Sequence, residues 1–162
     1  MSEVLPLNED SQVIPATTRD ELGSHGETLA AAFLVENGYR IVMSNFKVPV
    51  GRSSRGAQVT GEIDIIALDG ETLCFVEVKT RRSEEFTPVI TAIDRRKQRQ
   101  ITRTAKVYRR LFGVFEMAYR FDVVTILMAS GQEPRIDLIK NFWTESQFRK
   151  RSWNFEVWQD HF

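Results

Sequence analysis

Residues 61–80 read GEIDIIALDGETLCFVEVKT, and this segment decides the fold. Two runs rich in β-branched and aromatic residues flank Asp69-Gly70. An Asp-Gly pair between such runs is the strongest short-range signal for a β-hairpin. We therefore predict two antiparallel strands joined by a tight turn that is centred on Asp69 and Gly70.

The two faces of this hairpin differ in character. With that turn, Glu62 lies opposite Glu77 and Asp64 lies opposite Phe75, and side chains alternate between the faces. One face carries Glu62, Asp64, Glu77 and Lys79 together with Ile66, Leu73 and Phe75; the other carries Ile63, Ile65, Ala67, Cys74, Val76 and Val78. A sheet with apolar residues on both faces is typical of the interior of an α/β domain.

The carboxylates crowded at one end of the hairpin require an explanation, because like charges that face each other on a sheet are destabilising. One explanation is a solvated surface, where water screens the repulsion. The other is a divalent cation, since sites rich in oxygen ligands suit Mg²⁺ or Mn²⁺. The spacing alone leaves both open.

A family resemblance extends this reading beyond the hairpin. Asp64 followed by Glu77-Val78-Lys79 on the next strand resembles the motif of the PD-(D/E)xK nuclease superfamily, whose fold is that of type II restriction enzymes. Other short motifs follow in order: Gly26-Glu27-Thr28-Leu29-Ala30-Ala31, Gly38-Tyr39-Arg40-Ile41, Asn45-Phe46, Gly61-Glu62-Ile63-Asp64, Phe75-Val76-Glu77-Val78-Lys79-Thr80-Arg81 and Arg120-Phe121-Asp122-Val123-Val124. As an ordered set, over roughly residues 23–143, they resemble the YraN family of endonuclease-like proteins.

The resemblance implies an α/β fold with a restriction-endonuclease-like αβββαβ core, in which helices flank a mixed sheet. It implies metal-dependent hydrolysis of nucleic-acid phosphodiester bonds with Mg²⁺ or Mn²⁺, and a catalytic set of Asp64, Glu77, Lys79 and Glu27. Asp64, Glu77 and the Val78 carbonyl would hold the metal, with Glu27 or Glu62 in its outer shell. Lys79 would orient or help deprotonate the attacking water, or neutralise the scissile phosphate. The alternative is a non-catalytic nucleic-acid-binding or assembly protein that retains the nuclease fold.

The net charge is zero, but the positive charge is concentrated in residues 79–110. A helix is predicted over about 92–112, with Thr91 and Asp94 as its cap, and Lys97 interrupts its apolar stripe and is expected to point into the site. The other cations form either a solvated face or a phosphate-binding face. The predicted nucleic-acid contacts are Arg81, Arg82, Lys97, Arg95, Arg99 and Arg103. DNA is expected rather than RNA, and a homodimer is compatible with the sequence.

The sequence predicts one nuclease-like domain over residues 21–143. A loose tail is expected over residues 1–20 and an aromatic-rich extension over residues 144–162, whose rings either pack on the domain or stack on bases. No apolar run is long enough to span a bilayer, no signal pattern is present and Cys74 has no internal disulfide partner, so a cytoplasmic protein is expected.

Within the domain, a first helix is predicted over 25–37. Glu27 either caps this helix by pairing with Ser24 or points at the metal site, and His25 beside it is expected to be exposed to solvent. Strands are predicted over 39–48, 121–128 and 135–140. Residues 50–60 are predicted to form a long connection, whose arginines are either solvated or reach a phosphate.

Overall fold

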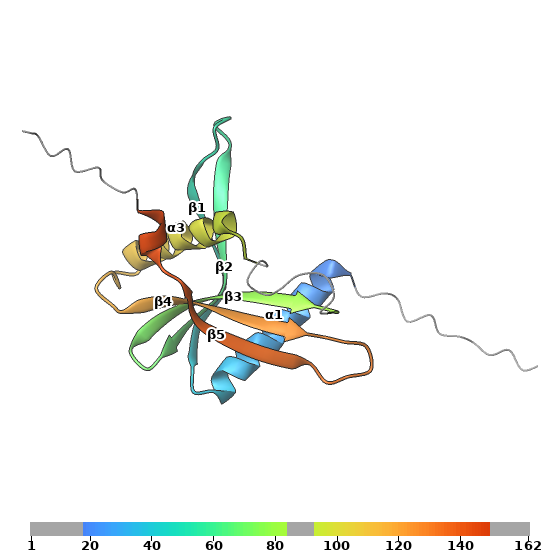
Figure 1. Ribbon diagram of the computed structural model, residues 1–162. Helices are drawn as coiled ribbons and strands as arrows, with labels where there is room; N and C mark the ends of the chain where they lie inside the picture. The colour runs from blue at the N-terminus through green and yellow to red at the C-terminus, as the bar shows by residue number, and fades with distance from the viewer. Residues whose placement is uncertain (1–17, 84–92, 150–162) are drawn as a thin grey trace, which may run out of the picture.

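The computed structural model describes residues 18–83 and 93–149, which form a five-stranded mixed sheet with α1 on one face and α3 on the other (Figure 1). The elements are α1 (Arg19–Glu36), β1 (Arg40–Arg52), β2 (Gln58–Asp69), β3 (Thr72–Arg81), α3 (Arg95–Leu111), β4 (Tyr119–Leu127), β5 (Arg135–Trp143) and the 3-10 helix η1 (Glu145–Phe148). The strands lie in sequence order, and only β3 and β4 are parallel. The predicted α/β fold is confirmed, and the strand that was expected to end at Lys140 continues to Trp143.

The β2–β3 hairpin forms, but its predicted register is wrong. Ile65 pairs with Val76 and Asp69 with Thr72, so the turn residues are Gly70 and Glu71. The partners are displaced by two residues, which preserves the face that each β3 side chain occupies. Leu73 and Phe75 accordingly join the core beneath α3, while Cys74, Val76 and Val78 join the core beneath α1.

The alternation of β2 breaks at Asp64. Ile65 packs in the core beneath α1, whereas Ile63 packs with Ile66 beneath α3, although Ile63 was expected on the same face as Ile65. Asn45 faces this break from β1, between the pairs Ser44–Ile65 and Phe46–Ile63, and adopts a positive φ of 54°. The distorted backbone turns β2 away from β3, whose ladder with β2 ends at Ile65.

Residues 50–60 are mainly strand rather than the predicted long connection. The β1–β2 ladder continues through the pairs Gly51–Val59 and Arg52–Gln58, so that only residues 53–57 form a turn. The turn favours glycine at position 56, because the backbone there adopts a positive φ of 80°. This two-stranded extension, residues 47–62, is called the ribbon below.

Helix α1 begins earlier than the sequence predicted. Thr18 and Glu21 form its capping box, with Thr18 Oγ1 accepting from Glu21 N–H and Glu21 Oε2 accepting from Thr18 N–H. Glu27 is therefore not the capping residue and lies in the middle of the helix. His25 is exposed, as expected, and most of the predicted tail, residues 1–17, lies outside the described residues.

Helix α3 connects the parallel strands β3 and β4, as predicted. Asp94 is its N-cap and accepts from Lys97 N–H at 2.8 Å; Thr91, which was expected to share this cap, lies outside the described residues. Ile101, Ala105 and Tyr108 face the sheet and are buried. No helix in the described ranges is long and apolar enough to cross a bilayer.

The start of the C-terminal region packs on the domain. Trp143 is stacked on Phe121, with ring centroids 4.8 Å apart, and its Nε1–H donates to Thr102 Oγ1 at 3.0 Å. Phe148 of η1 packs at the edge of the same core. The more distal aromatic residues, Trp153, Phe155, Trp158 and Phe162, lie outside the described residues, so their stacking role and the predicted domain bounds stay predictions.

Candidate functional site

The candidate site lies where β2 separates from β3. At this point the Asp64 carboxylate replaces a main-chain ladder bond, because its Oδ2 accepts from Val78 N–H at 2.8 Å. The bond holds Asp64 beside the end of β3 that carries Glu77 and Lys79. The structure thus brings together three of the predicted site residues at one point.

Glu77 is the most unusual residue of the site, because it is a carboxylate only 2% exposed. Its Oε1 lies 3.0 Å from Lys79 Nζ and 3.6 Å from Lys97 Nζ. Its Oε2 is buried and has no hydrogen-bond partner within the described part of the chain. Buried polar atoms in folded proteins are nearly always paired, so this oxygen is a candidate ligand atom. Lys97 points into the site, as its place in the α3 stripe predicted.

The acids of the site repel one another. Burial, and next the negative charge of Glu77, raise the pKa of Asp64 from its ordinary value to about 7, although the Val78 N–H opposes the shift. The pKa of Glu27 is also raised, mainly by burial, although a hydrogen bond with the Asn45 side chain opposes the shift. Both carboxyl groups would therefore be stabilised by an added positive charge.

Two close helix–strand contacts place α1 and α3 over the site. A Cβ on Gly26 would lie 1.9 Å from Thr80 Oγ1, so only glycine allows α1 to approach the end of β3 this closely. A Cβ on Gly61 would lie 1.9 Å from Thr104 Oγ1 of α3. The first contact brings Glu27 to the site, and the second fixes the foot of the ribbon against the helix that carries Lys97.

Two hollows adjoin these residues. A cleft of about 660 Å³ lies between the start of α1 and the end of β3 and is lined by Arg19, Leu22, Gly23, Glu27, Val78, Lys79, Thr80, Arg81, Arg82 and Ser83. A smaller hollow of about 260 Å³ is lined in part by Glu27, Asn45 and Asp64. Glu27 lines both hollows and therefore lies between the basic cleft and Asp64.

Glu62 is the predicted residue that the structure places differently. It faces Lys47 across the β1–β2 ladder, with Lys47 Nζ 3.3 Å from Glu62 Oε1, and does not lie opposite Glu77. Its charge nevertheless contributes to the raised pKa of Glu27. In the ranges that the structure describes, no three Asp, Glu, His or Cys side chains converge closely enough to hold a metal.

The remaining donors still fit a hard cation. Mg²⁺ is commonly bound by only one or two carboxylates and keeps several waters. Asp64 and Glu77 supply two carboxylates, and Glu77 Oε2 has no partner among the described residues. The donor set is therefore adequate for Mg²⁺ or Mn²⁺ and too poor in ligands for a closed protein cage.

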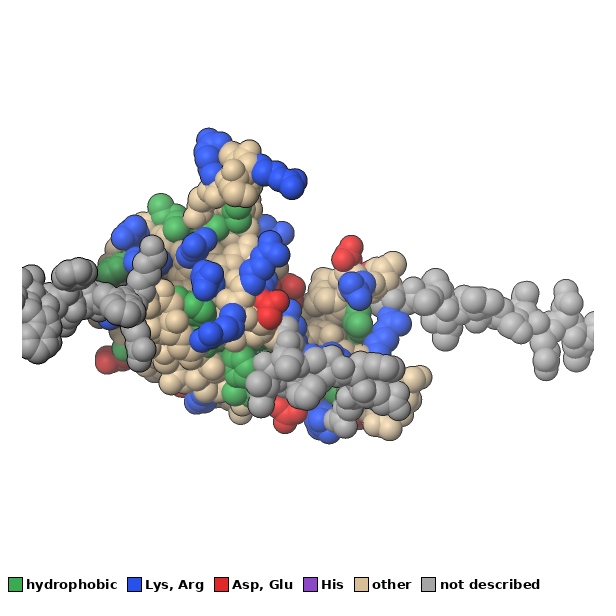
Figure 2. Space-filling view, turned by 45° about the horizontal axis from the view of Figure 1, so that its top comes forward, with side chains coloured by type: hydrophobic (Ala, Val, Ile, Leu, Met, Phe, Trp, Pro, Cys, Tyr) green, Lys and Arg blue, Asp and Glu red, His purple; other side chains and the backbone are tan. Residues whose placement is uncertain are grey.

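The predicted phosphate contacts on α3 are accessible. Arg95, Arg99 and Arg103 are exposed, and Figure 2 shows Lys and Arg side chains gathered on this side of the molecule. Arg81 and Arg82 line the cleft and also interact within the protein. Arg109 differs from them, because it is buried between the rings of Phe115 and Tyr119.

Comparison with known proteins places the chain in a family. The model of UPF0102, described as an uncharacterised protein family, matches residues 26–126. The chain belongs to the UPF0102 family. This is the YraN-like family, so the family resemblance seen in the sequence is confirmed.

UPF0102 relatives match over most of their length. The UPF0102 protein of Renibacterium salmoninarum is 39% identical over 123 residues, which cover 76% of this chain and 96% of the relative. That of Geobacter sulfurreducens is 43% identical over 120 residues, which cover 74% and 86%. The crystal structure of SSO0001 aligns with 79% of this chain and 55% of its own, at 15% identity and a TM-score of 0.36, too distant to inform the site.

Some residues of this UPF0102 chain acquire a role only in the structure. The site is shaped by Asn45, Gly26 and Gly61. An Asn or Gly in a predicted strand or helix indicates a distorted or closely packed backbone, so the sequence did contain a signal for these three residues.

The motif residues Arg120 and Asp122 do not belong to the site. Arg120 Nε donates to both Asp122 carboxylate oxygens at 2.9 Å, and Asp122 also accepts from Asn141 N–H, which fixes the β4–β5 bulge.

Proposed function

We propose that this UPF0102 protein is a metal-dependent nuclease of the PD-(D/E)xK type that hydrolyses phosphodiester bonds in nucleic acid. The observation that carries the proposal is the buried Glu77 carboxylate. Its Oε2 is without a partner among the described residues, its strand bonds to Asp64, and Lys79 Nζ lies 3.0 Å from its Oε1. A structural ion pair would satisfy both oxygens, whereas a site built for a cation leaves one available.

The donor set suits Mg²⁺ or Mn²⁺, held by Asp64, Glu77 and the Val78 carbonyl. Such an ion would lower the pKa of a bound water and stabilise negative charge on the phosphate. Glu27 would act from the outer shell, where it borders the cleft and the hollow at Asp64. Glu62, paired with Lys47, is the weaker candidate for that place.

The lysines would divide the remaining work. Lys79 lines the cleft and lies beside Glu77, so it is placed to orient the attacking water or to hold the scissile phosphate. Lys97 would hold the Glu77 side chain in position through its 3.6 Å contact. Arg81 and Arg82, further along the cleft, would bind neighbouring phosphates.

A second candidate function is nucleic-acid binding without cleavage. One observation favours it: Glu77 Oε1 already interacts with two lysines, which compensate the charge of this carboxylate without any metal ion. The basic surface would serve either function, so the two differ only in turnover and in the need for metal.

The test is cleavage of a panel of DNA and RNA structures with Mg²⁺, Mn²⁺ or chelator. Lys79→Ala should reduce the rate by at least about 100-fold, the usual contribution of a residue that acts on the transition state, while nucleic-acid affinity changes little. Lys140→Ala is the control, because Lys140 pairs with Asp69 at the other end of β2. Equal cleavage by Lys79→Ala and the parent excludes this role, and binding without any metal-dependent cleavage favours the second function.

A further inference from the structure

The ribbon, residues 47–62, leaves the sheet and contributes little to the core. Its strands pair with each other, while the β2–β3 ladder ends at Ile65. Every residue from Gly51 to Gln58 is exposed. In Figure 1 the ribbon projects beyond the body of the sheet beside α3. A two-stranded hairpin is marginally stable alone, so the ribbon must be supported by contacts with another element, and its projection from the sheet suggests a function.

The support comes from α3. Gln100 Nε2 donates to Thr60 O at 2.9 Å, and Thr104 packs on Gly61 too closely for any side chain there. Lys47 and Glu62 pair across the foot of the ribbon. The ribbon is therefore fixed at its base to the helix that also supplies Lys97 to the site.

The tip is internally bonded as well. Ser53 N–H donates to Ala57 O at 2.7 Å, Gly56 N–H donates to Ser53 O at 2.9 Å, and Ala57 N–H donates to Ser53 Oγ at 3.2 Å. The guanidinium of Arg52 donates to Gly56 O at 2.9 Å. These bonds give the turn one shape before any ligand binds, which reduces the entropy cost of binding.

The charge of the ribbon indicates an anionic ligand. The ribbon contains Lys47, Arg52 and Arg55 and a single acid, Glu62, which pairs with Lys47 at its foot, so the tip carries only positive charge. The supporting helix α3 has eight basic residues and no acidic one: Arg95, Arg96, Lys97, Arg99, Arg103, Lys106, Arg109 and Arg110. Figure 2 shows basic side chains at the tip of the ribbon and across the adjoining surface. Both surfaces meet at the site, through Lys97 of α3 and through Asp64, which lies on β2 two residues beyond the foot of the ribbon.

We infer that the ribbon inserts into the major groove of double-stranded DNA while α3 contacts the backbone. The major groove is about 12 Å wide and 8.5 Å deep and admits a two-stranded β-ribbon, whereas the minor groove is about half as wide. At about 3.4 Å per residue, the five steps from Lys47 to Arg52 extend the tip about 17 Å beyond its foot, enough to reach the groove floor. Arg52 and Arg55 would then contact phosphates or base edges. The inference names duplex DNA as the substrate class and rests on the proposed function only in taking nucleic acid as the ligand.

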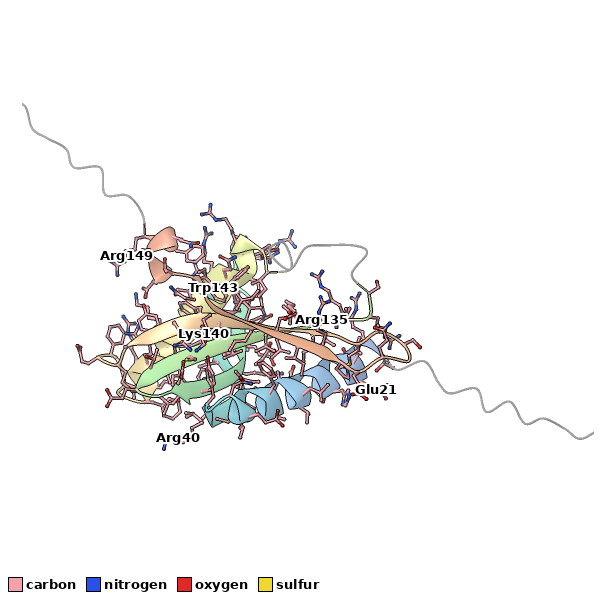
Figure 3. The ribbon with its side chains drawn as sticks, turned by 60° about the horizontal axis from the view of Figure 1, so that its bottom comes forward. Glu21, Arg40, Arg135, Lys140, Trp143 and Arg149 are labelled. Carbon is pink, nitrogen blue, oxygen red and sulfur yellow. The ribbon has the colours of Figure 1, made fainter. Side chains whose placement is uncertain are left out.

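The test measures equilibrium binding in chelator, without turnover, to duplex DNA, duplex RNA and single-stranded DNA of one sequence. Arg52→Gln with Arg55→Gln should weaken duplex DNA binding about tenfold or more. Duplex RNA and single strands should be affected about threefold at most, because the major groove of RNA is too narrow for the ribbon. The control removes two charges elsewhere, by Arg40→Gln with Lys140→Gln. Figure 3 shows both residues at the end of the sheet away from Arg135, and the control should reduce all three affinities slightly and equally.

A second variant tests the length of the ribbon; it removes Arg55 with the tip and keeps Arg52. Replacement of residues 53–57 by Asn-Gly should keep the strands and the melting temperature, and should selectively weaken duplex DNA binding because it shortens the tip beyond the Arg52–Gln58 pair. Equal loss on all three ligands, or no loss beyond the control, overturns the inference and leaves the proposed function intact. If the parent binds none of the three ligands, the proposed function fails as well.

Discussion

The ionisation of Asp64 is coupled to the stability of this fold. Its raised pKa means that the native state keeps a proton that the unfolded chain releases. The stability that this carboxyl group contributes is thus fully present below its unfolded pKa, near 4, and is lost as the pH rises through about 7.

Asp64→Asn provides the corresponding prediction. Asn can still accept from Val78 N–H but cannot ionise, so in chelator the variant and parent should unfold alike near pH 4. Between pH 4 and 7 the parent should lose up to about 1.4 kcal/mol per pH unit relative to the variant, and the difference should level off above pH 7. Urea unfolding at a series of pH values measures it. A difference that does not depend on pH contradicts the shifted pKa.

Gly26 offers a second prediction at the residue scale. Gly26→Ala should destabilise the fold by about 1–3 kcal/mol, because the new methyl group would overlap Thr80. Gly23→Ala is the matched control. Gly23 lies in the same helix, and a Cβ there would meet no described atom within 4 Å outside the helix backbone, so this alanine should stabilise by about 1 kcal/mol through helix propensity.

Thermal unfolding compares the two alanine variants. Restoration of stability in Gly26→Ala by a second change, Thr80→Gly, would identify the contact between α1 and β3. Similar changes in stability in Gly26→Ala and Gly23→Ala would mean that α1 can shift away from Thr80 to make room for the methyl group.

At the scale of elements, α3 combines an apolar stripe with an exposed basic face. Replacement of Arg95, Arg99 and Arg103 by Gln should flatten the plot of log affinity against log salt on duplex DNA, by about 0.9 for each phosphate that the helix no longer neutralises. Fluorescence anisotropy at several salt concentrations measures this slope. The Arg40→Gln, Lys140→Gln variant is the control, and an unchanged slope in the triple variant would assign the three arginines to a solvated surface.

The elements also show what could be predicted from the sequence. The periodicity of apolar residues reports burial directly, and it predicted the α3 stripe, the β3–α3–β4 connection and the orientation of Lys97 toward the site. Periodicity could not predict the register of β2 and β3, because Asp69-Gly70 and Gly70-Glu71 are both acceptable turns and local chemistry does not choose between them. Glu62 was misplaced because β2 separates from β3 before this residue, which pairs with Lys47 on β1 instead. The bend at Asp64 also escaped, since it depends on Asn45, a residue on another strand.

At the scale of the whole molecule, the acids of the site should make stability depend on metal. A cation that binds only the native state stabilises it by about 2.7 kcal/mol at one hundred times its dissociation constant, or roughly 5–11 °C for a chain of this size. Asp64→Asn should lose most of this shift. Asp137→Asn, which changes an exposed acid on β5, should keep it. Melting curves with Mg²⁺, Mn²⁺ and chelator decide the matter, and a parent without any metal-dependent shift contradicts the metal site.

The strand order, which follows the sequence order, has a consequence for the time the chain needs to fold. Three of the four strand pairs join neighbours through short turns, and such local contacts close rapidly. Only the parallel pair, in which Leu73 meets Tyr119, must first close a long loop that contains α3. Refolding should therefore be limited by the docking of β4 on β3. Until that docking, the edge of β3 stays open to other chains, and this is the stage at which the protein is most exposed to aggregation.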